Sequence, residues 1–474
     1  MDTRKILIGG KWSEAAETFS VHAPFSGTRL AEVFSASQAE NEQAISAAVD
    51  ASAEMRDLPR FQIASGLRQI ADSIKQRKDE FARALAEEAS KPMRYARGEV
   101  ERGIATFTVA ASEAERFVGE AVPLDTQPNG RGKTGWTLRV PLGVIYGITP
   151  FNFPLNLVAH KVAPALASGN SIIIKPSPRT PLTALLLGEV FLESGLPKSA
   201  LQIVPTDVKY IDSILSDERI AMLSFTGSAP VGWDLKQRAG KKAVALELGG
   251  NAPVIVDETA NFDRSVSRSV TGAFAYSGQV CISVQRVFVH EKFFDEWTNS
   301  FVETASKLKH GDPLNEDTEF SVMIDEAAAK RAESWVNEAV DNGAKLLCGG
   351  KRDGAMFEPV VLTNTHPEMR VVAEEVFAPI VVIEKFGDFR EAVDLANQSK
   401  YGLQAGVFTN DLANAEYAAN NLEYGGVIIN DTPTFRVDNM PYGGSKDSGF
   451  GREGLRYAME EMTERRLVVI DSGK

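Results

Sequence analysis

Short runs of apolar residues alternate with helical stretches in the chain after Pro141. The first block of this pattern contains the runs Val144–Ile148, Ser171–Ile174, Leu201–Val204 and Met222–Phe225. Short apolar runs without polar alternation are typical of strands that are buried on both faces. Because these runs alternate with helical stretches, the block predicts an α/β fold with a doubly wound parallel sheet.

A second block of the same kind extends from about Leu248 to Gly444. Its apolar runs are Pro253–Val256, Val287–Val289, Ile380–Ile383, Ala405–Phe408 and Val427–Ile429. A chain of 474 residues, 43% of them hydrophobic, is long enough for two or three domains. We therefore expect two doubly wound parallel-sheet domains with a cleft between them.

Other patterns precede and follow these blocks. From Ser37 to Ala111, alanine, glutamate, arginine and leucine recur at helical spacing, which predicts amphipathic helices with a weak point at Gly66. Trp136–Val140 alternates like an exposed strand and follows a cluster of turn residues, which predicts a hairpin. Arg465–Ile470 predicts a terminal strand that needs a partner, and the hairpin of another subunit is one solution.

The charge balance indicates what kind of partner the protein has. The chain carries 51 basic and 64 acidic residues, a net charge of -13, which disfavours nucleic acid and anionic membranes and favours a small molecule. An anionic substrate would have to be held by local cationic side chains or backbone amides. The five histidines do not stand at metal-ligand spacing, so we expect no catalytic metal.

Three features suggest a compartment. Residues Met1 to Trp12 lack the long apolar core of a signal peptide, and no uncharged apolar run approaches the length that spans a bilayer. Cys281 and Cys348 stand in contexts that do not suggest a disulfide. We expect a protein of the reducing cytoplasm.

Cys281 and Glu247 are candidates for nucleophile and base. Cys281 ends the segment Ser277–Cys281, whose glycine and serine suggest irregular backbone beside a site. The alternative is that Cys281 is a buried structural cysteine. For Cys348, in an αβ connection, a structural cysteine is our interpretation. Glu247 interrupts an apolar stretch before a glycine turn. If it is buried, its pKa is raised as a general base requires, whereas a solvent-facing glutamate is the alternative.

Three further segments end apolar strands, where ligands bind in parallel sheets. Asn152, in a loop rich in proline and phenylalanine, offers an amide that can donate to an oxyanion, or serves only as a turn residue. Lys175–Ser177 and Phe225–Ser228 precede helical stretches and suggest ribose and phosphate contacts. The segment Gly449–Gly454 spells a dinucleotide fingerprint, but it follows polar turns instead of a buried strand, so we reject it.

Together and in this order, these segments resemble the aldehyde dehydrogenase superfamily over essentially the whole chain. The matching stretches are Pro150–Pro154, Lys175–Ser177, Phe225–Ser228, Glu247–Asn251, Gly278–Cys281, Glu374–Pro379 and Pro441–Gly444. The resemblance implies a dinucleotide-binding domain (residues 1–119 and 142–247), a catalytic domain (248–446) and a β oligomerisation arm (120–141 and 462–474). It implies a homodimer or homotetramer.

The resemblance also implies the chemistry. Cys281 would attack an aldehyde, Asn152 and the Cys281 backbone N–H would stabilise the oxyanion, and hydride would pass to a nicotinamide, which leaves a thioester. Glu247 would activate water to hydrolyse that thioester. Lys161 and Glu453 match the family's proton relay, with a solvated helix charge and a helix cap as the alternatives.

The implied cofactor is NAD or NADP. Its contacts would be Thr149, Pro150, Phe151, Lys175, Ser177, Gly227, Ser228, Glu375 and Phe377. Many family members have a glutamate after the Lys-Pro-Ser segment, where this chain has Pro178. Because that glutamate would repel a 2′-phosphate, its absence permits NADP, with Arg179 close by, while NAD stays possible.

Two segments, Asn156–Lys161 and Thr432–Asp438, resemble the branch of lactaldehyde and phosphonoacetaldehyde dehydrogenases, which implies a small polar or anionic aldehyde. Arg102, His160 and Arg436 match positions that bind an anionic tail in parts of that branch, or else they are surface and packing charges. Some phosphate-handling relatives have an arginine directly before the nucleophile, where this chain has Val280, so the resemblance makes phosphorylated substrates less favoured. Lactaldehyde, phosphonoacetaldehyde and succinic semialdehyde stay open as substrates.

Two rival hypotheses concern the function itself. The protein could be a cysteine acyltransferase or hydrolase without redox chemistry, or a catalytically silent oligomer that keeps the fold.

Overall fold

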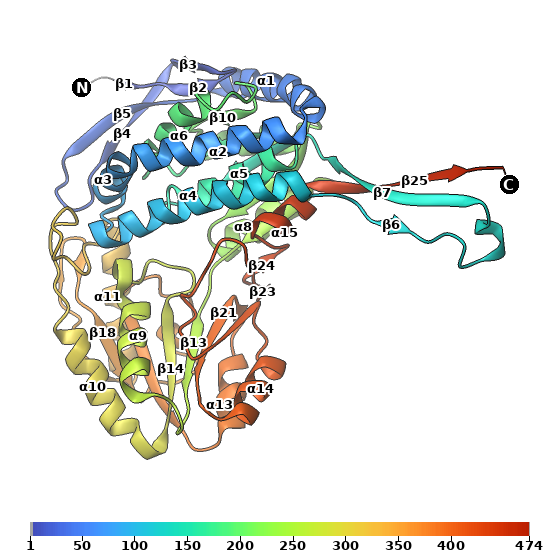
Figure 1. The fold of residues 1–474 in the computed structure, drawn as a ribbon. Helices are drawn as coiled ribbons and strands as arrows, with labels where there is room; N and C mark the ends of the chain where they lie inside the picture. The colour runs from blue at the N-terminus through green and yellow to red at the C-terminus, as the bar shows by residue number, and fades with distance from the viewer. Residues whose placement is uncertain (1–2, 474) are drawn as a thin grey trace.

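The computed structural model describes residues 3–473 (Figure 1), and the first block of apolar runs forms the centre of an eight-stranded sheet. In order across the sheet, the strands are β24 (Gly449–Phe450), β12 (Ala243–Glu247), β11 (Ile220–Thr226), β8 (Val144–Ile148), β9 (Ser171–Lys175), β10 (Leu201–Ile203), β2 (Ile6–Ile8) and β3 (Lys11–Ser13). The strands from β12 to β10 are parallel, and β24 and β2 flank them in antiparallel orientation. The parallel sheet is confirmed, and its antiparallel edges come from near the two ends of the chain.

The second block forms a seven-stranded sheet. Its strands, in order, are β15 (Lys345–Cys348), β18 (Val360–Thr363), β19 (Ile380–Phe386), β14 (Val284–His290), β13 (Ala252–Val256), β21 (Gln404–Phe408) and β22 (Gly426–Ile429). All of them are parallel except β15. Cys348 therefore lies at the end of a strand and not in a connection as expected, because the chain pairs with β18 before it turns at Gly349.

Helices cover both faces of each large sheet. The helices of the first unit are α1 (Gln38–Asp57), α2 (Arg60–Gln76), α3 (Lys78–Ala89), α4 (Met93–Arg116), α5 (Asn156–Ala167), α6 (Leu182–Leu192), α7 (Ile211–Ser216), α8 (Ala229–Arg238) and α15 (Leu455–Glu461). Successive residues of β8 point into different clusters: Ile145 packs with α2 to α6, and Tyr146 with α1, α7 and α8. This alternation explains why the strand sequences are apolar throughout.

The second unit follows the same rule. Its helices are α9 (Phe262–Phe274), α10 (Phe294–Ser306), α11 (Glu326–Asp341), α12 (Arg370–Ala373), α13 (Phe389–Asn397) and α14 (Leu412–Asn421). In β13, Val254 and Val256 pack toward α9 and α10, while Ile255 packs toward α13 and α14. Both units are therefore doubly wound.

Gly66 lies inside α2 without breaking it. A Cβ atom at this position would stand 2.5 Å from Cγ of Leu196, so the missing side chain makes room for that leucine. Gly66 is therefore not a weak point of the helix, because Leu196 occupies the space where a side chain would lie.

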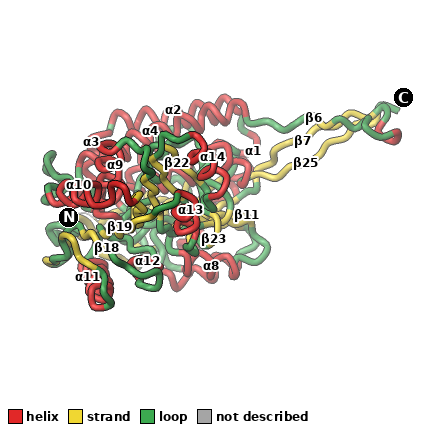
Figure 2. Tube along the Cα trace, turned by 90° about the horizontal axis from the view of Figure 1, so that it is seen from below, coloured by secondary structure: helices red, strands yellow, loops and turns green. Residues whose placement is uncertain are grey.

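A long β arm projects from the body (Figures 1 and 2). It consists of β6 (Ala121–Val122), β7 (Lys133–Pro141) and the terminal strand β25 (Thr463–Asp471). β25 pairs with β7 of the same chain along its whole length, from Thr463 opposite Pro141 to Asp471 opposite Lys133. The proposed pairing with another subunit's hairpin is therefore wrong for β7, because the chain's own hairpin occupies that edge.

The remaining strands form small sheets. They are β1 (Thr3–Arg4), β4 (Glu17–His22) and β5 (Arg29–Ser35) in one sheet, β16 (Arg352–Asp353) with β17 (Met356–Phe357), and β20 (Tyr401–Gly402) with β23 (Ser445–Lys446). Within residues 3–473, none of the helices has the length and apolar content needed to cross a bilayer.

Candidate active site

A cavity of about 280 Å³ lies between the two units, as expected for the cleft. Its walls include the predicted residues Pro150, Phe151, Asn152, Gly227, Ser228, Glu247, Cys281, Glu375 and Phe377. Residues that the sequence did not single out also line it: Leu157, Thr226, Leu248, Gly249 and Arg331. The cavity therefore brings the nucleophile, base and amide candidates together at the carboxyl ends of β8, β11 and β12.

Cys281 stands on a tightly wound loop after α9. Tyr276, Ser277 and Gly278 have successive positive φ angles of 51°, 53° and 67°, an uncommon conformation for the first two. Gly278 is required here, because a Cβ atom would lie 2.2 Å from the carbonyl oxygen of Ala378. The Ser277 hydroxyl holds the turn by donating to the Ser321 carbonyl at 2.5 Å.

The sulfur of Cys281 lies beside the Tyr442 hydroxyl and near the charged groups of Glu375, Arg436 and Glu247. Burial raises the pKa of the Cys281 thiol to about 11, and a hydrogen bond with Tyr442 acts in the opposite direction. The sulfur is 3.1 Å from the Tyr442 hydroxyl. The thiol is therefore protonated near neutral pH, and a base must remove its proton before it can attack a carbonyl.

Glu247 is the last residue of β12 and is 5% exposed. Burial, and then the nearby Glu453 carboxylate, raise the pKa of Glu247 well above its ordinary value, while Arg436 and Lys161 oppose the shift. Its Oε2 has no hydrogen-bond partner within the described chain. This is the buried, raised-pKa glutamate that the sequence analysis required of a general base, and the solvent-facing alternative is wrong.

Asn152 connects the two loops of the site. Its Nδ2 donates to the Gln279 carbonyl at 2.9 Å, while its Oδ1 has no partner among residues 3–473. Its own carbonyl accepts a hydrogen bond from Nζ of Lys91 at 2.7 Å. The amide is therefore held against the loop that carries Cys281.

Lys161 and Glu453 lie next to this group in a buried network. Nζ of Lys161 donates to the Ser224 hydroxyl at 3.0 Å and lies 3.6 Å from Oε1 of Glu453. Burial lowers the pKa of Lys161; burial also opposes ionisation of Glu453, but Lys161 and Arg436 lower the pKa of Glu453 overall. Both residues are buried, so the solvated-charge alternative for Lys161 is wrong.

The three predicted anion-binding residues do not line the cavity, and acidic partners hold them. Asp438 accepts from Arg102 at 3.0 Å and contacts His160 at 2.9 Å. Arg436 donates to Glu453 at 2.9 Å, and its guanidinium lies 3.7 Å from the centre of the Tyr442 ring. Arg436 thereby contacts Tyr442, whose hydroxyl in turn contacts Cys281 in the cavity wall.

The predicted cofactor contacts fall into two groups. Thr149, at the end of β8, and Lys175, at the end of β9, are buried, and the backbone N–H of Thr149 donates to the Lys175 carbonyl. The Ser177 hydroxyl accepts from the backbone of Arg179, whose guanidinium pairs with Asp325 at 2.8 Å. This group lies outside the walls of the cavity.

Glu375 and Phe377 face the cavity from the second unit. Oε1 of Glu375 accepts from the backbone N–H of Gly250 at 2.9 Å, and burial raises the pKa of Glu375 to about 7. Phe377 packs edge-on against Phe151, with ring centres 5.8 Å apart. Aromatic rings and a carboxylate thus form part of the cavity wall.

Tyr442 and Arg331 show why the sequence analysis missed some of the site residues. Tyr442 belongs to a stretch that carried the family resemblance, but the order of the residues gave no sign that its hydroxyl meets Cys281. Arg331, on α11, is one of many charges on an amphipathic helix, and only the packing of that helix brings it to the cavity wall.

Comparisons with known proteins agree with this geometry. The sequence model of the aldehyde dehydrogenase family matches residues 12–468. The 3-sulfolactaldehyde dehydrogenase of Priestia aryabhattai is 42% identical over 468 residues, 98% of each chain.

Solved structures are similar over nearly the whole chain. Aldehyde dehydrogenase 21 of Physcomitrella patens, in complex with succinate, has a TM-score of 0.97 and 44% identity, and the match covers 99% of this chain and 98% of that one. The glyceraldehyde-3-phosphate dehydrogenase GapN of Methanocaldococcus jannaschii, in complex with NADP, has a TM-score of 0.92 and 40% identity, covering 96% and 100%. The chain therefore belongs to the aldehyde dehydrogenase family of NAD(P)-dependent oxidoreductases.

Proposed function

We propose that the chain oxidises a small polar or anionic aldehyde to its carboxylic acid through a thioester on Cys281. The observation that carries this proposal is the single cavity that holds Cys281, Asn152 and Glu247 together with the Glu375 carboxylate. Family membership disfavours the rival hypothesis of a non-redox acyltransferase or hydrolase, which would need no nicotinamide.

The residues present fit a dinucleotide. Ser228 precedes α8 and its side chain makes no capping hydrogen bond, so the first turn of this helix offers backbone N–H groups to a phosphate beside the cavity. Lys175 and Ser177 would hold the adenosine ribose, and Glu375 with Phe377 the nicotinamide side. Bound NAD(P) supplies the hydride acceptor.

The protein's own residues would carry the remaining steps. Glu247 would take the proton of the Cys281 thiol, and the sulfur would then bond to the aldehyde carbon. The Asn152 amide and the backbone N–H of Cys281 would hold the resulting oxyanion. After oxidation, Glu247 would deprotonate the water that cleaves the thioester, and Glu453 with Lys161 would pass protons onward.

The charge cluster behind Tyr442 supports an anionic substrate tail. Arg102 pairs with Asp438, Arg436 and Lys161 pair with Glu453 and lie near Glu247, and burial lowers the pKa of His160 and favours its neutral form. Nε of both arginines is buried without a hydrogen-bond partner in the described chain. We propose that a carboxylate, sulfonate or phosphonate tail binds toward these donors; the names of two relatives, which mention sulfolactaldehyde and succinate, agree with that chemistry.

Cofactor choice stays open between NAD and NADP. Pro178 brings no acid that would repel a 2′-phosphate, and one structural relative was solved with NADP. The Arg179 guanidinium pairs with Asp325, so we assign it no phosphate contact.

The test is a panel of short aldehydes with and without an anionic tail, assayed separately with NAD and NADP. We expect reduced nicotinamide to form with the wild type and not with Cys281→Ser, and mass spectrometry to find an acyl group on Cys281. Ester turnover without any nicotinamide signal would instead favour the hydrolase.

We also propose roles for the parts of the chain. Residues 1–119 and 142–247 would bind the dinucleotide, residues 248–446 would carry the nucleophile, and residues 120–141 with 462–474 would join copies into a homodimer or homotetramer. The arm exposes apolar side chains, among them Leu138, Leu467 and Ile470, which agrees with contact to a second copy. The two free cysteines agree with a cytoplasmic enzyme.

A further inference from the structure

We propose that the hydroxyl of Tyr442 is a catalytic group of this site, which donates a hydrogen bond to the Cys281 sulfur as the thiolate forms. This inference rests on the proposed role of Cys281 as nucleophile. The two atoms are 3.1 Å apart. Because a thiolate carries no proton, the tyrosine hydroxyl must be the donor once Glu247 has taken the thiol proton.

The position of this hydroxyl is fixed by the packing of its ring. Tyr442 is 3% exposed and packs in one apolar cluster with Ile282 and Leu403. Its backbone N–H donates to the Glu453 carbonyl at 3.0 Å, and the Glu453 N–H donates back at 2.6 Å. The donor is therefore in place before the sulfur ionises, as preorganised electrostatic stabilisation requires.

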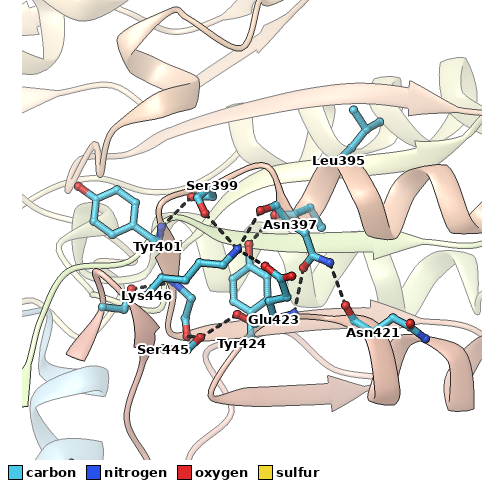
Figure 3. Close-up of polar contacts among 12 residues, drawn as sticks. Leu395, Asn397, Ser399, Tyr401, Asn421, Glu423, Tyr424, Ser445 and Lys446 are labelled. Carbon is cyan, nitrogen blue, oxygen red and sulfur yellow. Dashed lines mark hydrogen bonds and ion pairs between the residues drawn. The ribbon is translucent and has the colours of Figure 1, made fainter. Parts of the chain in front are cut away.

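The segment after Tyr442 is anchored equally firmly (Figure 3). Ser445 and Lys446 pair with β20, and the Lys446 ammonium donates to the carbonyls of Asn397 at 2.9 Å and Ser399 at 3.2 Å. The same ammonium forms an ion pair with Glu423 at 2.7 Å. Tyr442 is thus held on one side by Glu453 and on the other by this network.

The environment of the ring favours donation. The Arg436 guanidinium lies 3.7 Å from the ring centre, and a cation at the ring face makes the phenol a stronger donor. Burial raises the pKa of Tyr442 well above its ordinary value, so the phenol keeps its proton at neutral pH. Arg436 thereby acts on the nucleophile through Tyr442, in addition to its proposed role toward the substrate.

The step balances without any further reactant. The Cys281 S–H bond breaks and its proton passes to Glu247, while the Tyr442 hydroxyl keeps its proton and points it at the sulfur. When the sulfur bonds to the aldehyde carbon, its negative charge moves to the aldehyde oxygen. The hydrogen bond to sulfur then weakens, and Asn152 becomes the relevant donor.

The test compares Tyr442→Phe with the parent protein, both carrying Cys348→Ser because that cysteine is also free, by alkylation of Cys281 with iodoacetamide, followed by intact mass from about pH 6 to about pH 10. Because a hydrogen bond to a charged group is worth about a factor of ten or more, we expect alkylation of the variant to slow by about tenfold near neutral pH and its pH profile to move upward. An unchanged profile, or faster alkylation, would overturn the proposal.

The matched control is Tyr424→Phe (Tyr424 is labelled in Figure 3), which removes the hydroxyl of a partly buried tyrosine of the second unit that donates to the Ala396 carbonyl at 2.6 Å. It should leave the alkylation profile of Cys281 unchanged. Blocking Cys281 in the parent protein and in Tyr442→Phe separates the two proposals. If alkylated protein keeps full activity, the nucleophile assignment fails; if activity is lost but the profiles coincide, only the Tyr442 role fails.

Discussion

At the scale of single residues, the properties of the site depend on the burial of its ionisable groups around Cys281. Its thiol, Glu247 and Glu375 all have raised pKa values because burial disfavours their charged forms. An ionised group in such surroundings is a stronger base or nucleophile than the same group in water. The site therefore gains reactivity from burial, and it needs nearby donors wherever charge develops.

Replacing Glu247 with glutamine tests both proposed halves of the reaction. Glutamine cannot accept a proton from the Cys281 thiol or from water, so formation and hydrolysis of the thioester should each slow by about a hundredfold or more, without a rapid burst of reduced nicotinamide. Rapid-mixing absorbance measures the burst and the later steady rate. Glu384→Gln, which changes a mostly buried carboxylate bonded to Thr365, should leave both phases intact. A Glu247→Gln enzyme with wild-type steady turnover would exclude Glu247 as the base.

The direction of the pH dependence follows from the same burial. As the proposed base, Glu247 would act only when ionised, and its pKa is raised, so kcat/KM should rise with pH over a range well above the ordinary titration of glutamate. The free energy of unfolding should fall over the same range. A carboxyl whose pKa is raised in the folded state destabilises the protein once the pH exceeds the pKa of that carboxyl in the unfolded chain. A profile of kcat/KM against pH measures the first effect, and a flat profile would contradict it.

At the scale of elements, one buried ion pair holds three segments of the site. The Lys91 ammonium pairs with Glu99, lies 3.8 Å from the Phe153 ring centre and donates to the Asn152 carbonyl. Glu99 also accepts hydrogen bonds at 2.9 and 3.1 Å from the backbone N–H groups of Leu155 and Asn156, at the start of α5. Tyr276 adds a bond to the Ala89 carbonyl. The loops of Asn152 and Cys281 are therefore tied to the segment between α3 and α4.

Breaking this pair on one side should be costly. Lys91→Met leaves the Glu99 carboxylate buried without its cation, so we expect a loss of about 3–5 kcal/mol in the free energy of unfolding. Adding Glu99→Gln should restore part of that stability, since glutamine still accepts at α5, but not kcat, because nothing then holds the Asn152 carbonyl. Urea denaturation and steady-state kinetics measure the two effects, and full recovery of kcat would show that Lys91 does not position Asn152.

Two helix glycines should respond in opposite directions. Gly98 in α4 has open space around an added Cβ atom, so Gly98→Ala should raise the free energy of unfolding by up to about 1 kcal/mol. Gly66→Ala in α2 should lower it, because the methyl group would clash with Leu196. Thermal unfolding of both variants tests the contrast, and equal shifts would contradict the packing account.

How much the sequence predicts depends on whether a signal is local. Runs such as Val144–Ile148 predict strands correctly because burial on both faces demands apolar residues without a break. Glu247 was recognisable because a carboxylate inside an apolar stretch is unusual. The contact of Tyr442 with Cys281 and the pairing of Arg102 with Asp438 join residues that are remote in the chain, so neither was visible before the fold was known.

At the scale of the whole molecule, the arm offers an edge for assembly. β25 pairs with β7 on one side only, so its outer edge is open among the described residues, and Leu467 and Val469 are exposed on it. If copies join here, replacing both residues with lysine should shift the molecule toward smaller species in light scattering. The same substitutions at Arg465 and Arg466 keep the charge and serve as the control. An unchanged molar mass would remove the arm from the interface.

The pairing of β24 with β12 has a consequence for how ligands enter and leave the site. Phe450 and Gly449, which follow the second unit in the chain, are hydrogen-bonded opposite Leu246 and Glu247 of the first, and α15 then packs on α5. This pairing ties the segment that follows the second unit to the strand that carries Glu247, so we expect the two units to move little relative to one another when a ligand enters. Entry and exit would then require rotations of cavity-wall side chains such as Phe151 and Phe377, and turnover should be insensitive to solvent viscosity beyond simple diffusion.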